Sequence, residues 1–213
     1  MEMKQHLMNY LQPYFEHKKY AEGKLGIDFI RKTSFGHSCI QCLVTEYEDG
    51  VIIRYFAGIR NDLLERSLNH LLGENLLRYD GITSLMVEAD IIKYGKKGTE
   101  FRYFCRNKEE IKKSGDDFID LMDRKGFDFL DYYKSVEKID SLYNDRPRLS
   151  AAWTNNSYIR SFRAMTSAKI LGRADYDRLF FMHQQYLAEH GFKGMILEKF
   201  NRTFARLKRV SLN

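Results

Sequence analysis

Residues 40–59 read IQCLVTEYEDGVIIRYFAGI, and apolar side chains recur there at every second position. The alternation covers residues 40–44 and resumes over residues 51–59. Such a period of two is typical of a β-strand that buries one of its faces. The Asp49-Gly50 dipeptide between the two runs is the strongest short signal for a tight hairpin turn. The sequence therefore predicts two antiparallel strands that meet at this turn.

A second hairpin is predicted after the first one. Its strands would span residues 83–94 and 100–106, joined by Gly95-Lys96-Lys97-Gly98. The paired glycines supply the positive φ angles that a tight turn needs. Together with a strand that starts near Ile27, these segments predict an antiparallel sheet of about five strands within residues 25–106.

The remaining segments repeat their apolar residues at helical spacing. This spacing predicts helices over residues 4–22, from Asn61 or Asp62 to Gly73, from Asn107, again from Ser114-Gly115-Asp116 to Arg124, and over residues 156–171, 174–190 and 192–210. Gly172 and Gly191 stand where the last helices should stop. Because strands come first and helices follow, the predicted fold class is α+β: an antiparallel sheet in the N-terminal half, with a helical C-terminal half packed against it.

The domain organisation follows from composition. The chain has 213 residues and only two prolines, and it contains no Ser/Gly-rich linker. We therefore expect a single α+β domain over residues 1–213. If the chain does divide, the expected parts are a sheet-containing part, residues 1–106, and a helical part, residues 107–213.

Positive charge is concentrated near the end of the chain. Residues 145–213 hold 13 Lys and Arg against 5 Asp and Glu, whereas the net charge of the whole chain is +6. Lys199, Arg202, Arg206 and Arg209 fall on one stripe of the last predicted helix. The stripe is either a solvated helix face or a surface that binds anions, including the phosphates of a nucleic acid. Five further cations are expected to extend this surface, namely Arg160, Arg163, Lys169, Arg173 and Arg178.

Cys39 and Cys42 form a C-x-x-C pair, which suits zinc or thiol exchange when it stands at a helix start. Here the pair lies in a strand, where residues three apart point to opposite faces. Only Cys105 remains as a further thiol. We expect a structural role for these cysteines, and we predict no metal and no cofactor.

Two groups of acidic residues offer alternatives. Asp116, Asp120 and Asp123 share one helix face, which is either a solvated face, a site for Mg²⁺ or Ca²⁺, or a partner for the basic C-terminal helices. The second group contains Asp80, Glu88, Asp90 and Lys93, and it is similar to the metal site of a nuclease, although its spacing departs from the usual D…(D/E)-x-K pattern.

The histidines form no local catalytic signature. His183 lies on an apolar helical stripe and is expected in the core, and His190 suits a helix C-terminus. The sequence also lacks a G-x-S-x-G, a P-loop, a G-x-G-x-x-G and an H-E-x-x-H motif. We therefore predict no catalytic residues and favour a protein without enzymatic activity.

A cytoplasmic location is expected, because no apolar run is long enough to span a membrane and three cysteines suit a reducing compartment. The leading function hypothesis is a protein-binding module, since 14% aromatic residues supply anchors for an interface. The alternatives are nucleic-acid binding through the basic C-terminal helices and a metal-dependent hydrolase or nuclease. The sequence leaves the partner's identity and the oligomeric state open.

Overall fold

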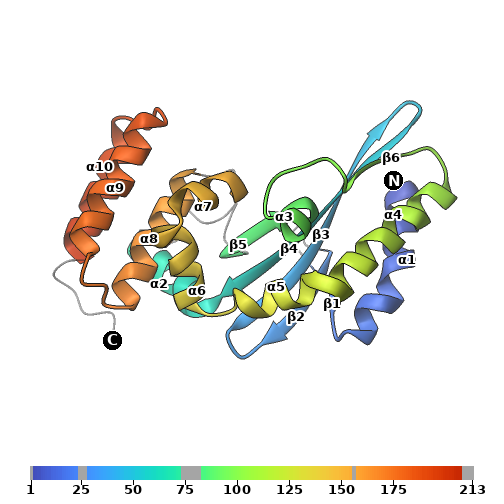
Figure 1. The fold of residues 1–213 in the computed structure, drawn as a ribbon, viewed down its shortest axis with the longest axis horizontal. Helices are drawn as coiled ribbons and strands as arrows, with labels where there is room; N and C mark the ends of the chain where they lie inside the picture. Colours follow the sequence, from blue (N-terminus) through green and yellow to red (C-terminus); the bar gives the residue numbers. More distant parts are fainter. Residues whose placement is uncertain (1, 24–27, 73–82, 155–156, 208–213) are drawn as a thin grey trace. The chain divides into compact units, whose positions relative to one another are not determined.

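The computed structural model describes residues 2–23, 28–72, 83–154 and 157–207 (Figure 1). The chain forms two compact units. Unit 1 comprises residues 1–60 and 85–132, and unit 2 comprises residues 61–84 and 133–213. No helix in the described parts of the chain combines the length and the apolarity that crossing a lipid bilayer requires.

Unit 1 is built around an antiparallel sheet of six described strands. The strands are β1 (Ala21–Glu22), β2 (Phe29–Thr33), β3 (Gly36–Tyr47), β4 (Gly50–Asn61), β5 (Leu85–Glu88) and β6 (Arg102–Cys105). Their order is β1-β2-β3-β4-β5, and β6 also pairs with β4. The predicted antiparallel sheet in the N-terminal half and the hairpin at Asp49-Gly50 are therefore confirmed.

The second predicted hairpin is wrong. β5 and β6 each pair with β4 instead: residues 51–54 of β4 face β6, and residues 56–59 face β5. The predicted strand over residues 83–94 ends at Glu88, and α3 (Ala89–Tyr94) follows it. Gly95, with φ of 71°, donates its N–H to the carbonyl of Ile91. Its positive φ therefore ends a helix rather than forming a hairpin turn.

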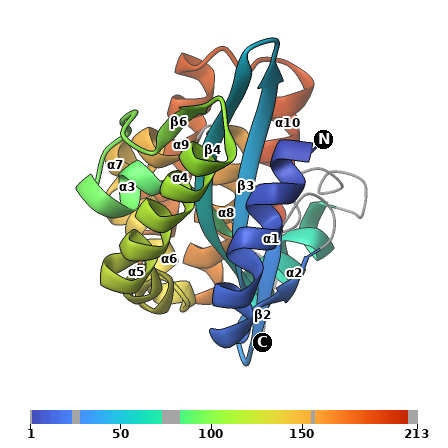
Figure 2. The same ribbon diagram turned by 90° about the vertical axis from the view of Figure 1, so that its right-hand side faces the viewer.

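One face of the sheet is buried under α1 (Glu2–His17) and α4 (Lys108–Leu121), which lie side by side along it (Figure 2). The ring centroid of Phe15 on α1 lies 4.7 Å from that of Phe29 on β2. Phe118 of α4 stacks on Tyr55 of β4, with 4.4 Å between ring centroids. These rings fill the core of unit 1, and we call the covered side the inner face.

The helices of unit 1 differ from the prediction in two places. α1 ends at His17 rather than near Glu22, and Lys19 adopts a positive φ of 65° after it. α4 runs without a break through Gly115, where a restart was predicted. A Cβ atom at Gly115 would lie 2.9 Å from the ring of Tyr10, so this glycine lets α1 and α4 approach closely. A π-helical turn, η1 (Met122–Gly126), and α5 (Phe127–Tyr132) follow.

The described secondary structure of unit 2 is helical after Asn61, the last residue of β4. Its helices are α2 (Asp62–Leu72), α6 (Val136–Asp140), a π-helical turn η2 (Ser141–Asp145), α7 (Pro147–Trp153), α8 (Ser157–Ile170), α9 (Tyr176–Glu189) and α10 (Met195–Leu207). Leu68 of α2, Phe162 of α8, Leu179 of α9 and Phe204 of α10 belong to one buried cluster. The predicted helical C-terminal half is therefore confirmed, whereas its packing against the sheet stays a prediction.

Helix boundaries in unit 2 follow the expected capping chemistry. The side chain of Asn61 accepts a hydrogen bond from the backbone N–H of Leu64 at 3.1 Å, which makes Asn61 the N-cap of α2. Gly172 and Gly191 follow α8 and α9 with φ of 60° and 81°, as predicted for helix stops. The predicted stop at Gly73 lies outside the described residues.

Candidate functional site

The cysteines are buried thiols. Cys39, Cys42 and Cys105 are all free. Burial raises the pKa of the Cys39 thiol to about 12, so it stays protonated at neutral pH and is a poor nucleophile. Within the described residues, no three side chains of His, Cys, Asp or Glu are grouped so that they could hold a metal ion.

The described members of the second acidic group, which the sequence likens to a nuclease metal site, each have a different partner: Glu88, Asp90 and Lys93. Glu88 forms an ion pair with Arg54. The buried carboxylate of Asp90 accepts the backbone N–H groups of Glu100 and Phe101 at 3.0 and 3.3 Å. Lys93 forms an ion pair with Glu100, and Asp80 lies outside the described residues. The structure therefore does not bring the three described members to one metal centre.

The three acidic side chains that share one face of α4 and η1, which we call the acidic row, also form hydrogen bonds or ion pairs: Asp116, Asp120 and Asp123. Asp116 accepts the hydroxyl of Tyr10, and Asp123 lies 2.7 Å from the ammonium of Lys18. Asp120 forms an ion pair of 2.8 Å with Arg124, one turn away. The described partners of this row are Tyr10 of α1, Lys18 just after α1 and Arg124 of η1, so its pairing with the basic C-terminal helices stays a prediction.

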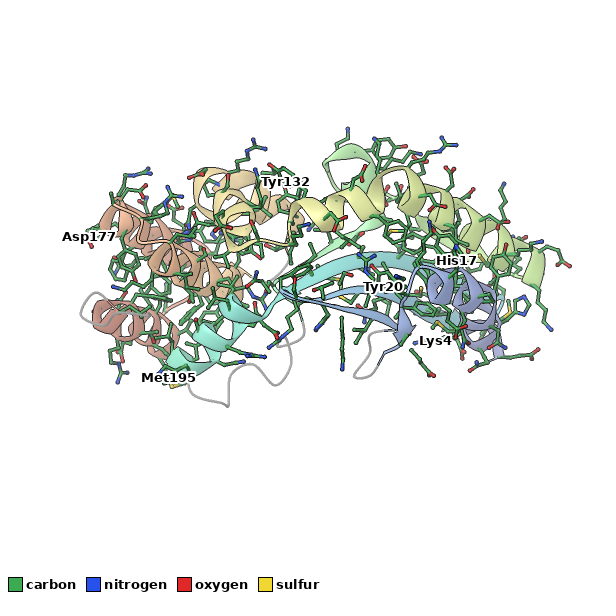
Figure 3. The ribbon with its side chains drawn as sticks, turned by 90° about the horizontal axis from the view of Figure 1, so that it is seen from below. Lys4, His17, Tyr20, Tyr132, Asp177 and Met195 are labelled. Carbon is green, nitrogen blue, oxygen red and sulfur yellow. The ribbon has the colours of Figure 1, made fainter. Side chains whose placement is uncertain are left out.

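The basic stripe on α10 is described only in part. Lys199 is half-buried, whereas Arg202 is 69% exposed and pairs with Glu198 at 3.2 Å. The side chain of Arg206 and the whole of Arg209 lie outside the described residues. Asp177 at the start of α9 and Met195 at the start of α10 point away from the helices (Figure 3). Anion binding by this stripe stays a prediction.

Several cations that were expected on the same surface lie inside unit 2, which corrects the prediction. Arg160 is 1% exposed, and its guanidinium lies 4.1 Å from the ring centroid of Tyr186. Arg163 forms a buried ion pair with Glu65. Arg173 is held by three carboxylates, those of Asp140, Asp145 and Asp175. Much of the positive charge is therefore balanced internally rather than offered to a partner.

His183 lies in the core of unit 2, as predicted. Asn144 donates through its amide to Asp140 and to the carbonyl of Ala164, so its amide oxygen is free to accept from His183 Nε2 at 2.9 Å. Burial and the nearby charge of Arg160 lower the pKa of His183 to about 3. A neutral imidazole with one buried hydrogen bond acts as a structural group here. His190 caps the C-terminus of α9.

The surface that stands out in unit 1 is the side of the sheet that faces away from α1 and α4, which we call the outer face. On β4 the side chains of Val51, Ile53 and Tyr55 are buried, while Ile52, Arg54 and Phe56 between them are only half-buried. Strand alternation directs the second set away from α1 and α4. The outer face contains the apolar residues Ile30, Leu43, Ile52, Phe56, Met86 and Phe104, and the charged residues Lys32, Arg54, Glu88, Arg102 and Arg106.

The pairing of β4 with its neighbours places these side chains in rows. Ile52 lies opposite Phe104, and Arg54 lies opposite Arg102. Phe104 and Leu43 are 40% and 42% exposed, unusually high values for large apolar side chains in a sheet. The outer face therefore presents an apolar centre crossed by a row of arginines.

Electrostatics add a second feature to the outer face. The guanidinium of Arg54 lies 5.2 Å from the ring centroid of Phe56, and that of Arg106 lies 4.9 Å from that of Phe104. Glu88 is the only carboxylate among the charged residues that define this face, and it pairs with Arg54. The face therefore carries a positive excess. The sequence signal for this face is the half-polar set Ile52, Arg54 and Phe56, which alternates with the buried residues of β4.

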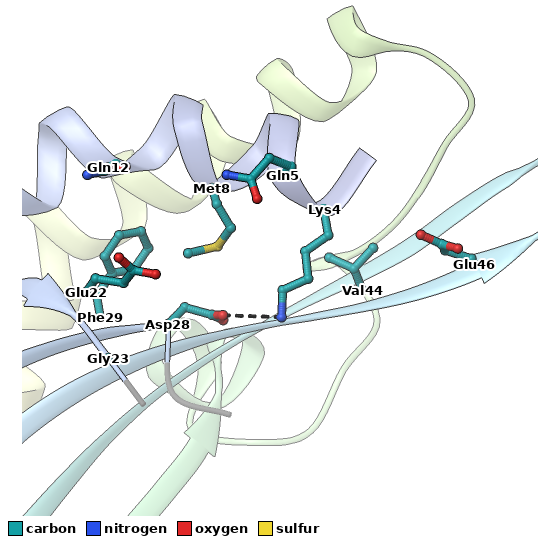
Figure 4. Close-up of a pocket in the computed structure, with 10 residues that line it drawn as sticks. All are labelled: Lys4, Gln5, Met8, Gln12, Glu22, Gly23, Asp28, Phe29, Val44 and Glu46. Carbon is teal, nitrogen blue, oxygen red and sulfur yellow. Dashed lines mark ion pairs between the residues drawn. The ribbon is translucent and has the colours of Figure 1, made fainter. Parts of the chain in front are cut away.

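A hollow of about 580 Å³ lies on the inner side, between α1 and the first strands (Figure 4). Met8, Phe29 and Val44 form its apolar wall. The ammonium of Lys4 lies 3.3 Å from the buried carboxylate of Asp28. Because the two charges neutralise each other, this pair offers no unbalanced charge to a ligand.

The comparisons with known proteins assign no role to any of these residues. No family model, curated protein or solved structure matches the chain.

Proposed function

We propose that the chain is a protein-binding module and that the outer face of the sheet binds its partner. The observation that carries the proposal is the exposure of Phe104 and Leu43 beside the arginine row of β4 and β6. Interfaces between proteins are enriched in aromatic residues, Met and Arg, and depleted of Lys and Glu. The outer face, as defined above, has two Phe, one Met and three Arg against one Lys and one Glu.

The charges of the outer face specify the chemistry of the partner. Arg102 and Arg106 are exposed, and neither forms an ion pair within the described residues. Arg54 is neutralised by Glu88 nearer the middle of the sheet. A matching partner would place apolar side chains over Ile52 and Phe104 and carboxylates opposite the two exposed arginines. Such complementarity would steer association and fix the register of the complex.

A protein fits this face better than a nucleic acid does. Bases stack on open aromatic rings, but Arg54 and Arg106 already lie over Phe56 and Phe104. The two rings are also separated along β4, because Phe104 faces Ile52, four residues before Phe56. Glu88 would repel phosphates next to Phe56. Nucleic-acid binding is therefore an outcome of the test rather than a second proposal.

Site-specific photo-cross-linking in the native host tests the proposal. The photoreactive residue p-benzoylphenylalanine replaces Phe104 in one variant and Phe181, which is 65% exposed on α9, in a matched control. We expect one stoichiometric protein adduct from position 104 and none of comparable yield from position 181. Equal labelling at both positions, or nuclease-sensitive adducts from position 104, would contradict the proposal.

A further inference from the structure

A second cavity of unit 1 lies on the inner side of the sheet, away from the outer face. It opens between β6, the end of α3, α4 and η1, and its volume is about 400 Å³. That volume falls within the roughly 300–1,000 Å³ of small-molecule pockets. Phe101 and Leu121 are both buried and supply its apolar floor. We call it the α4 cavity.

The rim of the α4 cavity is held in place by hydrogen bonds. The buried carboxylate of Asp90 accepts the N–H groups of Glu100 and Phe101. A Cβ atom at Gly98 would lie 2.6 Å from a carboxylate oxygen of Asp90, so the loop closes tightly on this residue. A rim fixed in this way is pre-organised, which lowers the entropy that a ligand must lose on binding.

Four charged side chains that line the cavity neutralise one another in pairs. Lys93 forms an ion pair with Glu100, which also accepts the hydroxyl of Tyr94. Arg124 forms an ion pair with Asp120 at 2.8 Å. These pairs leave no net charge for a ligand to balance.

Two further charges in the cavity have no oppositely charged partner among the described residues. The carboxylate of Asp117 accepts only the hydroxyl of Tyr103, at 3.2 Å. The ammonium of Lys125 donates to the backbone carbonyl of Lys93 at 3.0 Å. Both side chains are exposed, so the rim of the cavity carries one negative charge and one positive charge without an ionic partner among the described residues, next to an apolar floor.

The position of Lys125 depends on the π-helical turn η1. This turn widens the helix between Met122 and Gly126, and a Cβ atom at Gly126 would lie 2.3 Å from the sulfur of Met122. A side chain at position 126 would therefore displace the buried side chain of Met122 within this turn. π-helical turns occur frequently at functional sites, because they redirect side chains that a regular helix would point elsewhere.

We propose that the α4 cavity binds a small zwitterion, with its ammonium group at Asp117, its carboxylate at Lys125 and its apolar part on Phe101 and Leu121. Asp117 and Lys125 are eight positions apart in the sequence, which is about two helical turns along α4 and η1. A free amino acid and a short peptide share the required chemistry. This site is independent of the outer face, so either proposal can fail without the other.

Isothermal titration calorimetry on the full chain tests the site with named probes. L-leucine and glycyl-L-leucine carry both charges, whereas 4-methylpentanoate lacks the ammonium and 3-methylbutylamine lacks the carboxylate. We expect at least one zwitterion to bind, and each singly charged analogue to bind about tenfold more weakly or not at all, because one protein charge would stay unbalanced. Tighter binding of the dipeptide would assign the site to peptides, and tighter binding of leucine to free amino acids.

Variants at the two unbalanced charges complete the test. We expect Asp117→Asn and Lys125→Met each to weaken the zwitterion about tenfold, because each leaves one ligand charge unpaired. Lys113→Met is the matched control, since Lys113 is exposed on α4 and does not line the cavity. Circular dichroism verifies that the variants fold. No binding of either zwitterion at 10 mM, or singly charged analogues that bind equally well, would overturn the proposal.

Discussion

Arg163 of α8 donates two hydrogen bonds to the carboxylate of Glu65 on α2, at 2.9 and 3.3 Å, and both side chains are buried. The two residues are 98 positions apart in the sequence. The parallel geometry of the two bonds is the strongest arrangement available to a carboxylate and a guanidinium. This pair therefore joins α2, the helix that directly follows β4, to α8 within unit 2.

Removing one member of this pair should destabilise the protein strongly. We expect Glu65→Ala to lower the free energy of unfolding by about 3–5 kcal/mol, because Arg163 would remain buried without a counter-charge. Urea unfolding followed by circular dichroism measures the effect. Arg66→Ala, which removes an exposed ion pair to Asp62, is the control and should cost about 1 kcal/mol or less.

The double variant Glu65→Leu/Arg163→Met separates the loss of a charge from the loss of packing. Apolar residues of similar volume often replace a buried ion pair at little cost, so we expect most of the lost stability to return. A double variant as unstable as Glu65→Ala would show that the network around the pair, rather than the unpaired charge, dominates.

Gly115 should tolerate no large side chain. Tyr10 lies 2.9 Å from the position of a Cβ atom there, so Gly115→Leu would force α1 away from α4. We expect a loss of about 1–3 kcal/mol, typical of overpacking. Thermal unfolding measures it against Lys113→Leu, which changes an exposed position of the same helix. Equal stability of the two variants would argue against the close contact between these helices.

The stability of the protein should fall as the pH falls from about 6.5. In the folded state the pKa of His183 is lowered from 6.5 to about 3, mainly by burial. Between these values the unfolded chain binds a proton that the folded chain does not bind. The stabilisation is therefore complete above pH 6.5 and declines below it, by about 1.4 kcal/mol per pH unit for this group.

The variant His183→Gln isolates this contribution, because glutamine can still donate to Asn144 but does not titrate. We expect its unfolding free energy to change less between pH 6.5 and pH 4.5 than that of the unaltered protein. Urea unfolding at pH 7.5, 6.5, 5.5 and 4.5 supplies both curves. Parallel curves would mean that His183 takes up its proton over the same pH range in the folded and in the unfolded chain.

The parts of the fold that depend on neighbouring residues could be predicted from the sequence. The hairpin at Asp49-Gly50 and the helix stops at Gly172 and Gly191 each follow from residues within a few positions. Pairing over longer distances could not be predicted in this way. In the sequence, the segments that form β5 and β6 resemble the two strands of one hairpin. In the structure, each of them pairs with the long strand β4 instead.

Charge was the least reliable guide to the surface. The sequence predicts Arg160 and Arg163 on the surface, but Arg160 is buried against Tyr186 of the next helix and Arg163 pairs with Glu65, 98 positions away. The outer face shows the opposite case. The sequence contains the pattern of a half-exposed face, because Ile52, Arg54 and Phe56 alternate with buried residues. The pattern does not reveal that the described helices α1 and α4 of unit 1 cover only the opposite side.

If a protein partner binds to the outer face, its affinity should depend on the exposed arginines of that face, and a charge-reversal variant measures this dependence. Arg102→Glu reverses an exposed charge in the arginine row, and Arg202→Glu reverses an equally accessible charge on α10. With the cross-linked partner purified, we expect Arg102→Glu to raise the Kd about tenfold or more and Arg202→Glu to leave it within about twofold. A Kd that Arg202→Glu raises and Arg102→Glu leaves unchanged would contradict the account.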